Sequence, residues 1–280
     1  MNIRSIILPI LLVTCIFAGI AANPDIQAFK GKVKDGYNFW LYTPASAAAD
    51  NDSTGTPLLI FLHGASLCGK NLDRVKRYGT IDAISMGREL DAYVVAPQNP
   101  GGAWSPRRIM NIVDYIEKNH RIDTTRIYVL GMSLGGYGTL DLAATYPDRI
   151  AAAIAMCGGA SVTDLSGLSR LPLWIIHGTG DRAVTVAQSD RVVEAVNAGR
   201  DSSDTVRLTY DRIKGMNHSR PARLFYRKEI YDWLLSHSLT DSLRAAKPTF
   251  PLTEQVFQSA YDGLKAPARR SHRRHSRRRR

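Results

Sequence analysis

The sequence is poor in cysteine and lacks the spacings that bind structural metals. Its 280 residues include three cysteines, Cys15, Cys68 and Cys157. No two of them form a Cys-x-x-Cys pair or a Cys/His spacing typical of zinc sites, so no metal centre is expected. Cys15 lies in an N-terminal apolar stretch, which leaves Cys68 and Cys157 as candidates for one internal disulfide or for two free thiols.

The chain also has little charge excess outside its C-terminus. The formal net charge is +12, but residues 266–280 contain eight arginines and no acidic residue, which leaves only +4 for the rest. Enzymes that bind nucleic acids carry positive charge across one face of the fold, so no nucleic-acid partner is expected. The arginine-rich tail, 266–280, is predicted to be disordered. It either contacts anionic surfaces or is an extension without a specific role.

No apolar run is long enough for a comfortable membrane span, but the N-terminus has the pattern of an export signal. Arg4 precedes the apolar stretch Ile6–Ile20, and small residues stand at the −3 and −1 positions of a cut after Ala21. We therefore expect residues 1–21 to be a signal peptide and the protein to be secreted or periplasmic. The alternatives are a lipid anchor on Cys15 and, less favoured, a retained N-terminal anchor.

Short apolar runs alternate with helical patterns along most of the chain. The expected strands are 29–33, 37–42, 58–62, 93–96, 127–130, 150–155, 173–176 and 206–210, and the expected helices are 81–90, 106–119, 134–146, 187–198 and 223–236. Asp35 and Gly36 between the first two strands predict a hairpin. This alternation predicts an α/β domain, 22–238, whose mostly parallel sheet has helices on both faces. A C-terminal extension, 239–265, follows, with a weak helix at 253–264.

One glycine-rich segment has the pattern of a nucleophile turn. Residues 131–135 read Gly-Met-Ser-Leu-Gly, directly after an expected strand and at the start of an expected helix. A serine on such a strained turn is lifted above the sheet, and side chains in place of Gly131 and Gly135 would crowd it. The helix N-terminus favours negative charge nearby. Ser133 is therefore the candidate nucleophile, and a chance glycine-rich turn is the less favoured alternative.

A serine nucleophile needs a histidine base held by an acid, and with this motif the chain order is Ser, acid, His. His218 lies in a loop between the last expected strand and the last expected helix, which is the position for the base. Asp181 follows the strand 173–176 and is the candidate acid. His177 is expected to shape the same loop, and His237 is expected at the surface. The competing acids Asp190, Asp201 and Asp204 are predicted to be capping or solvated residues.

Acyl transfer also needs two backbone N–H groups that stabilise an oxyanion. One is expected from Leu134, the residue after the nucleophile. The other is expected from the loop after strand 58–62, at Ala65 or alternatively at Ser66, where Gly64 permits a close approach. Trp104 either lines an acyl or sugar pocket or packs in the core.

These motifs together resemble a known family. The segment 127–159, with Gly-Met-Ser-Leu-Gly-Gly-Tyr-Gly-Thr-Leu-Asp-Leu-Ala at its centre, resembles the secreted esterase and "predicted peptidase" branch of the α/β-hydrolases, and the likeness extends over about 37–236. Relatives include feruloyl and acetylxylan esterases and polyhydroxyalkanoate depolymerases. The resemblance implies an α/β-hydrolase fold and acyl transfer to water without metal or cofactor. The sequence departs from many relatives at Asn217 and at 219–221, around the candidate base.

The sequence therefore predicts a secreted serine hydrolase that cleaves carboxylic esters, on small molecules or on polysaccharides, through an acyl-enzyme. A serine peptidase of the prolyl-oligopeptidase type would use the same three residues and is the first alternative. A non-catalytic surface-binding protein is the second, and a missing member of the triad would have supported it.

Overall fold

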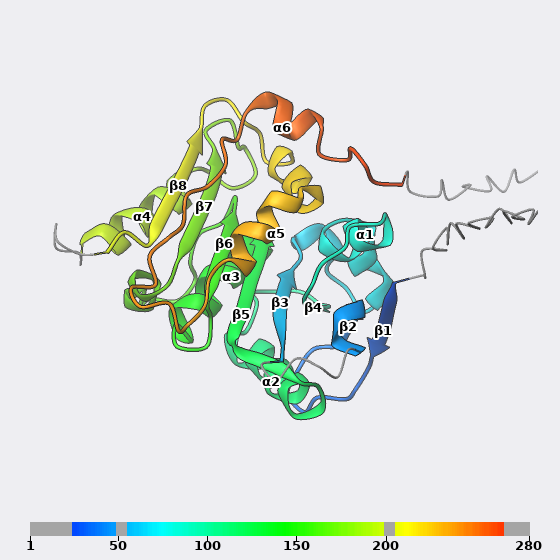
Figure 1. The fold of residues 1–280 in the computed structure, drawn as a ribbon. Coiled ribbons are helices and arrows are strands. Elements are labelled where there is room, and N and C mark those ends of the chain that lie inside the picture. The colour runs from blue at the N-terminus through cyan, green and yellow to red at the C-terminus, as the bar shows by residue number, and fades with distance from the viewer. Residues whose placement is uncertain (1–23, 49–54, 199–204, 266–280) are drawn as a thin grey trace, which may run out of the picture.

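The computed structural model describes residues 24–48, 55–198 and 205–265, and within these ranges eight strands form one sheet (Figure 1). The strands are β1 (Asp25–Phe29), β2 (Phe39–Thr43), β3 (Thr56–Leu62), β4 (Tyr93–Pro97), β5 (Ile122–Met132), β6 (Ala152–Met156), β7 (Leu173–Gly178) and β8 (Leu208–Ile213). Their order across the sheet is β1-β2-β4-β3-β5-β6-β7-β8. β2 is antiparallel to β1 and β4, and all other neighbours are parallel. The expected mostly parallel sheet is therefore confirmed.

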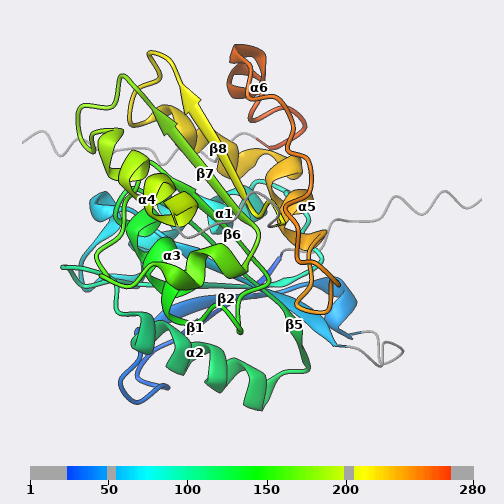
Figure 2. The ribbon, with the colours of Figure 1, turned by 90° about the vertical axis from the view of Figure 1, so that its left-hand side faces the viewer.

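Helices cover both faces of this sheet (Figure 2). They are α1 (Thr80–Ser85), α2 (Pro106–Asn119), α3 (Leu134–Thr145), α4 (Ala187–Ala198), α5 (Lys228–Leu235) and α6 (Glu254–Gln258), with short 3-10 turns between them. Alternate residues of a strand point to opposite faces. Leu59 and Phe61 accordingly belong to the core layer that includes residues of α1 and α5, whereas Leu58 and Ile60 belong to the layer that includes residues of α2, α3 and α4. Burial on both faces explains the continuous apolar run of β3.

Some boundaries differ from the sequence-based expectations. β1 and β2 do pair as a hairpin, but they are shifted outward and joined by residues 30–38, so Asp35 and Gly36 lie in a long loop rather than a tight turn. The helix expected at 81–90 ends at Ser85. The helix expected at 223–236 is divided into a 3-10 turn, Arg220–Tyr226, and α5. Element ends depend on tertiary packing, which a local pattern does not contain.

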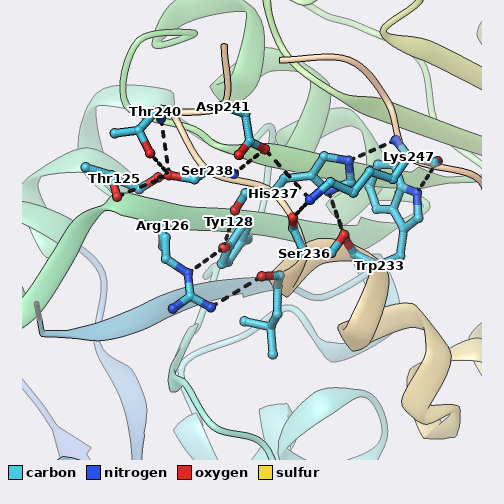
Figure 3. Close-up of polar contacts among 11 residues, drawn as sticks. Thr125, Arg126, Tyr128, Trp233, Ser236, His237, Ser238, Thr240, Asp241 and Lys247 are labelled. Carbon is cyan, nitrogen blue, oxygen red and sulfur yellow. Dashed lines mark hydrogen bonds and ion pairs between the residues drawn. The ribbon is translucent and has the colours of Figure 1, made fainter. Parts of the chain in front are cut away.

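The segment after Ser238 packs along the domain. Figure 3 shows its first part, where Ser238 contacts Thr125 at the start of β5 and the Lys247 amide donates to Nε2 of His237. Farther on, Phe257 of α6 is 3% exposed, and the Lys265 amide donates to the Met86 carbonyl. The weak helix expected at 253–264 is confined to α6 and the turns after it.

Within the described residues, no helix has both the length and the apolar character needed to cross a bilayer. The expected signal peptide, 1–21, and the arginine-rich tail, 266–280, lie outside the described residues, as does Cys15.

Candidate active site

Ser133 stands on the turn between β5 and α3. Its φ of 59° and ψ of −123° are unusual for a residue with a side chain and mark local strain. The neighbouring glycines are required by close packing. A Cβ atom on Gly135 would lie 1.9 Å from the carbonyl oxygen of Leu62, and one on Gly131 would lie 2.3 Å from the carbonyl oxygen of Gly135. The glycines thus let the turn press against β3 and hold the serine above the sheet.

The tertiary structure brings His218 and Asp181 to this serine. Nε2 of His218 lies 3.0 Å from Oγ of Ser133, and Nδ1 of His218 lies 2.6 Å from Oδ2 of Asp181. Asp181 follows β7 and His218 follows β8, so both residues sit in loops at the carboxyl edge of the parallel strands. A hydroxyl, an imidazole and a carboxylate connected in this order can pass the hydroxyl proton to the imidazole.

The carboxylate of Asp181 is buried, yet hydrogen bonds keep it ionised. Burial raises the pKa of Asp181, but hydrogen bonds from His218 and from the amides of Val184 and Ala183 outweigh burial, so the pKa lies below its usual value. Both amides donate to Oδ1, at 2.8 Å from Ala183 and 2.9 Å from Val184. Oδ2 is thereby left to the side chains around it.

The two expected oxyanion donors lie beside the nucleophile turn. Leu134 begins α3, and Ala65 begins a 3-10 turn after β3. A Cβ on Gly64 would lie 3.5 Å from Cβ of Ser133, so the β3 loop reaches the serine directly. The Gly64 amide itself donates to the hydroxyl of Tyr78, at 3.2 Å, and so is not one of the available donors. No pattern in the sequence indicates that Tyr78 contacts the loop after β3.

His63 fixes the loop that carries Ala65. Its side chain is fully buried, and its Nδ1 lies 2.8 Å from the carbonyl oxygen of Gly64. The backbone amide nitrogen of Asn99 lies 3.0 Å from Nε2 of His63. Because the amide can only donate, Nε2 accepts and Nδ1 carries the proton. Burial lowers the pKa of His63 to about 4, which keeps the ring neutral at pH 7. The sequence pattern predicts the loop after strand 58–62 but gives His63 itself no role.

Trp104 is a core residue. Its side chain is 3% exposed, and its indole N–H donates to the carbonyl oxygen of His63 at 3.3 Å. Its ring also packs against Tyr37 and Gly138. Of the two sequence-based interpretations, core packing therefore fits the structure, and a pocket wall does not.

Asp190 and His237 have surroundings separate from the triad, and Asp201 and Asp204 lie outside the described residues. Asp190 accepts hydrogen bonds from Tyr210 and Arg212. His237 is 1% exposed and bonds the carbonyl of Trp233, so the expectation that it lies at the surface was wrong. The segment after it covers its ring, which a local pattern does not reveal.

The two cysteines of the described residues, Cys68 and Cys157, form no disulfide there. Cys157 is fully buried next to Asp181. Burial raises the pKa of its thiol, and the negative charge of the Asp181 carboxylate raises it further. Cys157, Asp181 and His218 offer possible metal-ligand atoms within 4.8 Å of one another. In this structure, however, Asp181 and His218 bond each other and His218 bonds Ser133, so these donors already have partners within the protein.

Sequence comparisons match the part of the chain that contains Ser133, Asp181 and His218. Residues 93–237, slightly more than half of the chain, match the Esterase family. A bifunctional acetylxylan esterase/xylanase of Neocallimastix patriciarum is 28% identical over 172 residues, covering 58% of this chain and 24% of that protein. The poly(3-hydroxyalkanoate) depolymerase C of Paucimonas lemoignei is 28% identical over 204 residues, covering 54% of this chain and 48% of that protein. The chain thus spans less than half the length of these curated relatives.

Solved structures have the same fold. A thermostable esterase superposes with a TM-score of 0.61 at 24% identity, covering 76% of this chain and 63% of that one. The feruloyl esterase module of Clostridium thermocellum superposes with a TM-score of 0.57 at 14% identity, covering 82% of this chain and 92% of that one. The match over residues 93–237 and the sheet order lead to one conclusion: the chain belongs to the Esterase family and has the α/β-hydrolase fold.

Proposed function

We propose that the protein is an exported serine hydrolase that cleaves carboxylic esters with Ser133, His218 and Asp181. The observation that carries this proposal is the continuous hydrogen-bonded chain from the Ser133 hydroxyl through His218 to Asp181. Family membership supports the same chemistry.

The proposed reaction has two steps. Ser133 Oγ attacks the ester carbonyl carbon while Nε2 of His218 takes its proton, and the amides of Ala65 and Leu134 stabilise the oxyanion. The C–O bond to the alcohol then breaks, and His218 returns the proton to the leaving oxygen. His218 then takes a proton from a water molecule, which attacks the acyl carbonyl carbon. The bond from this carbon to Oγ breaks, the acid is released, and His218 returns the proton to Oγ of Ser133. Throughout, Asp181 stays ionised and stabilises the imidazolium.

The substrate class is part of the proposal. Because one relative is an acetylxylan esterase, we propose acyl groups on polysaccharides as substrates, with small esters also accepted. We also propose that residues 1–21 direct export, that 22–238 form the catalytic domain, and that 239–265 form an extension packed on it. N-terminal sequencing of the exported protein should begin at Ala22, and a chain that keeps Met1 or starts at Cys15 would contradict the proposed cut.

Hydrolysis of p-nitrophenyl acetate, butyrate and octanoate tests the function, followed by acetate release from acetylated xylan. The protein should hydrolyse at least one ester in the presence of a chelator, and Ser133→Ala should not. Turnover by Ser133→Ala close to the wild-type rate would overturn the mechanism. Activity on acylated peptides but on no ester would instead favour the serine peptidase.

A further inference from the structure

A second histidine contacts the acid of the proposed triad. His177 ends β7 four residues before Asp181, and its side chain is fully buried. Its Nε2 lies 3.2 Å from Oδ2 of Asp181 and 3.0 Å from the carbonyl oxygen of Val184. On the other side of the ring, Nδ1 lies 2.8 Å from Oγ of Ser189, which lies 2.8 Å from the carbonyl oxygen of Gly158.

These neighbours fix the direction of the hydrogen bond to Asp181. An ionised carboxylate and a backbone carbonyl are both acceptors only, so Nε2 of His177 must carry a proton and donate it. The Ser189 hydroxyl has a single proton. It goes either to Nδ1 of a neutral ring or to the Gly158 carbonyl, in which case Nδ1 also donates and the ring is an imidazolium. In both arrangements Nε2–H is shared between the two acceptors beside it, Oδ2 of Asp181 and the carbonyl oxygen of Val184.

Oδ2 of Asp181 is therefore shared between two imidazoles. His218 reaches it through Nδ1 at 2.6 Å and His177 through Nε2 at 3.2 Å, while the amides of Ala183 and Val184 occupy Oδ1. We propose that His177 is a positioning residue, whose buried Nε2–H holds Oδ2 of Asp181 in the orientation that His218 needs and moderates the pull of this oxygen on the His218 proton. This inference rests on the proposed function.

Other ionisable groups also lie near His177, and their charges affect the pH profile of activity. Asp181 faces Nε2 directly, and Cys157 and His218 in turn contact Asp181. Asp190, on α4, interacts electrostatically with His177, but it is itself held by Tyr210 and Arg212. Replacement of His177 removes a donor from Oδ2, and a positive charge as well if the ring is charged. Both changes strengthen the attraction between Asp181 and the protonated His218.

The test compares His177→Phe, which keeps a ring without donors, with His177→Gln, whose amide nitrogen can take the place of Nε2. For p-nitrophenyl acetate, we expect His177→Phe to lower kcat by about 10- to 100-fold with little change in KM, because a misplaced base slows the chemistry and not binding. The acidic limb of the kcat/KM profile should move to higher pH by about half a unit. His177→Gln should restore both values toward wild type.

Two controls separate this role from packing. His237→Phe removes another buried, hydrogen-bonded histidine and should lower stability without moving the pH profile. Ser189→Ala frees the far side of the His177 ring and should move kcat and the acidic limb in the same directions as His177→Phe, by less, even if His177→Phe does not fold. An unchanged pH profile in His177→Phe would overturn the inference. If His177→Phe does not fold, an unchanged pH profile in Ser189→Ala would overturn it instead. A loss of kcat in His177→Gln equal to that in His177→Phe would also overturn it.

Failure of the proposed function gives a different result. If the wild-type protein hydrolyses no ester, the function is wrong, and the role of His177 is then tested by proton NMR. The Nδ1–H of His218 in its bond to Asp181 should give a downfield resonance, assigned by its loss in His218→Gln. That resonance should shift in His177→Phe and return in His177→Gln. An identical resonance in all His177 variants would exclude the positioning role whatever the activity.

Discussion

Nε2 of His218 lies 3.0 Å from Oγ of Ser133 although 85 positions separate the two residues in the chain. The contact exists because β5 and β8 are parallel strands of the same sheet and both end at the same edge. In the proposed mechanism the serine depends on this contact for activation, so Ser133→Ala and His218→Ala should each lower kcat for ester hydrolysis by about 10⁴-fold or more. The double variant should be no slower than the singles, and additive losses would contradict a concerted unit.

Asp181→Asn probes the orientation of His218. The amide preserves the shape of the carboxylate but presents an N–H to an imidazole that needs an acceptor at Nδ1. We expect kcat to fall by about 10⁴-fold at neutral pH. The melting temperature should change little. As a matched control, Asp190→Asn changes an aspartate held by Tyr210 and Arg212 and should keep nearly full kcat.

Gly135→Ala probes the tightness of the nucleophile turn. A Cβ there would lie 1.9 Å from the backbone oxygen of Leu62, so β3 or α3 must move. We expect a loss of about 3 kcal/mol or more in the free energy of unfolding, measured by urea denaturation, together with loss of activity. Thr145→Ala, at an exposed position of the same helix, should change stability by less than about 0.5 kcal/mol.

The buried His63 predicts how stability depends on pH. Its pKa of about 4 in the folded protein lies below the value of 6.5 for the unfolded chain, so the unfolded state binds the proton more tightly. Stability from this residue is therefore complete above pH 6.5 and is lost as the pH falls toward 4, by up to about 3 kcal/mol. Denaturation series between pH 4 and 7 should show that the free energy of unfolding falls less in His63→Asn than in the wild-type protein as the pH is lowered. An equal loss in both proteins would exclude His63 as the source.

Phe257 probes the attachment of the C-terminal extension. It is 3% exposed, and Arg223 donates to its carbonyl oxygen at 2.9 Å. We expect Phe257→Ala to cost about 3 kcal/mol of stability by leaving a cavity. Gln255→Ala, on the exposed side of α6, should cost little. If Phe257→Ala is as stable as Gln255→Ala, the extension does not contribute to the folded domain.

The sequence by itself determined the fold and the nucleophile turn. Alternating apolar runs and helical patterns are local signals, spread over about ten to fifteen residues. A strand buried on both faces must be apolar throughout, so residues such as 58–62 predict the sheet. Ser133 was predicted as the nucleophile in the same way, because the turn needs glycines at fixed positions within five residues. The choice of His218 and Asp181 came from a rule of chain order, which also depends on how this fold connects its strands.

Tertiary structure alone decided which groups meet across the sheet edge. That His177 faces Asp181, that Trp104 fills the core and that His237 is covered follows from contacts between separate segments. A histidine or tryptophan has the same local pattern in a core, a pocket or a surface loop. Its surroundings depend on packing between elements far apart in sequence. Burial and hydrogen-bond partners then decide the charge of the side chain and whether it takes part in the site or only in packing.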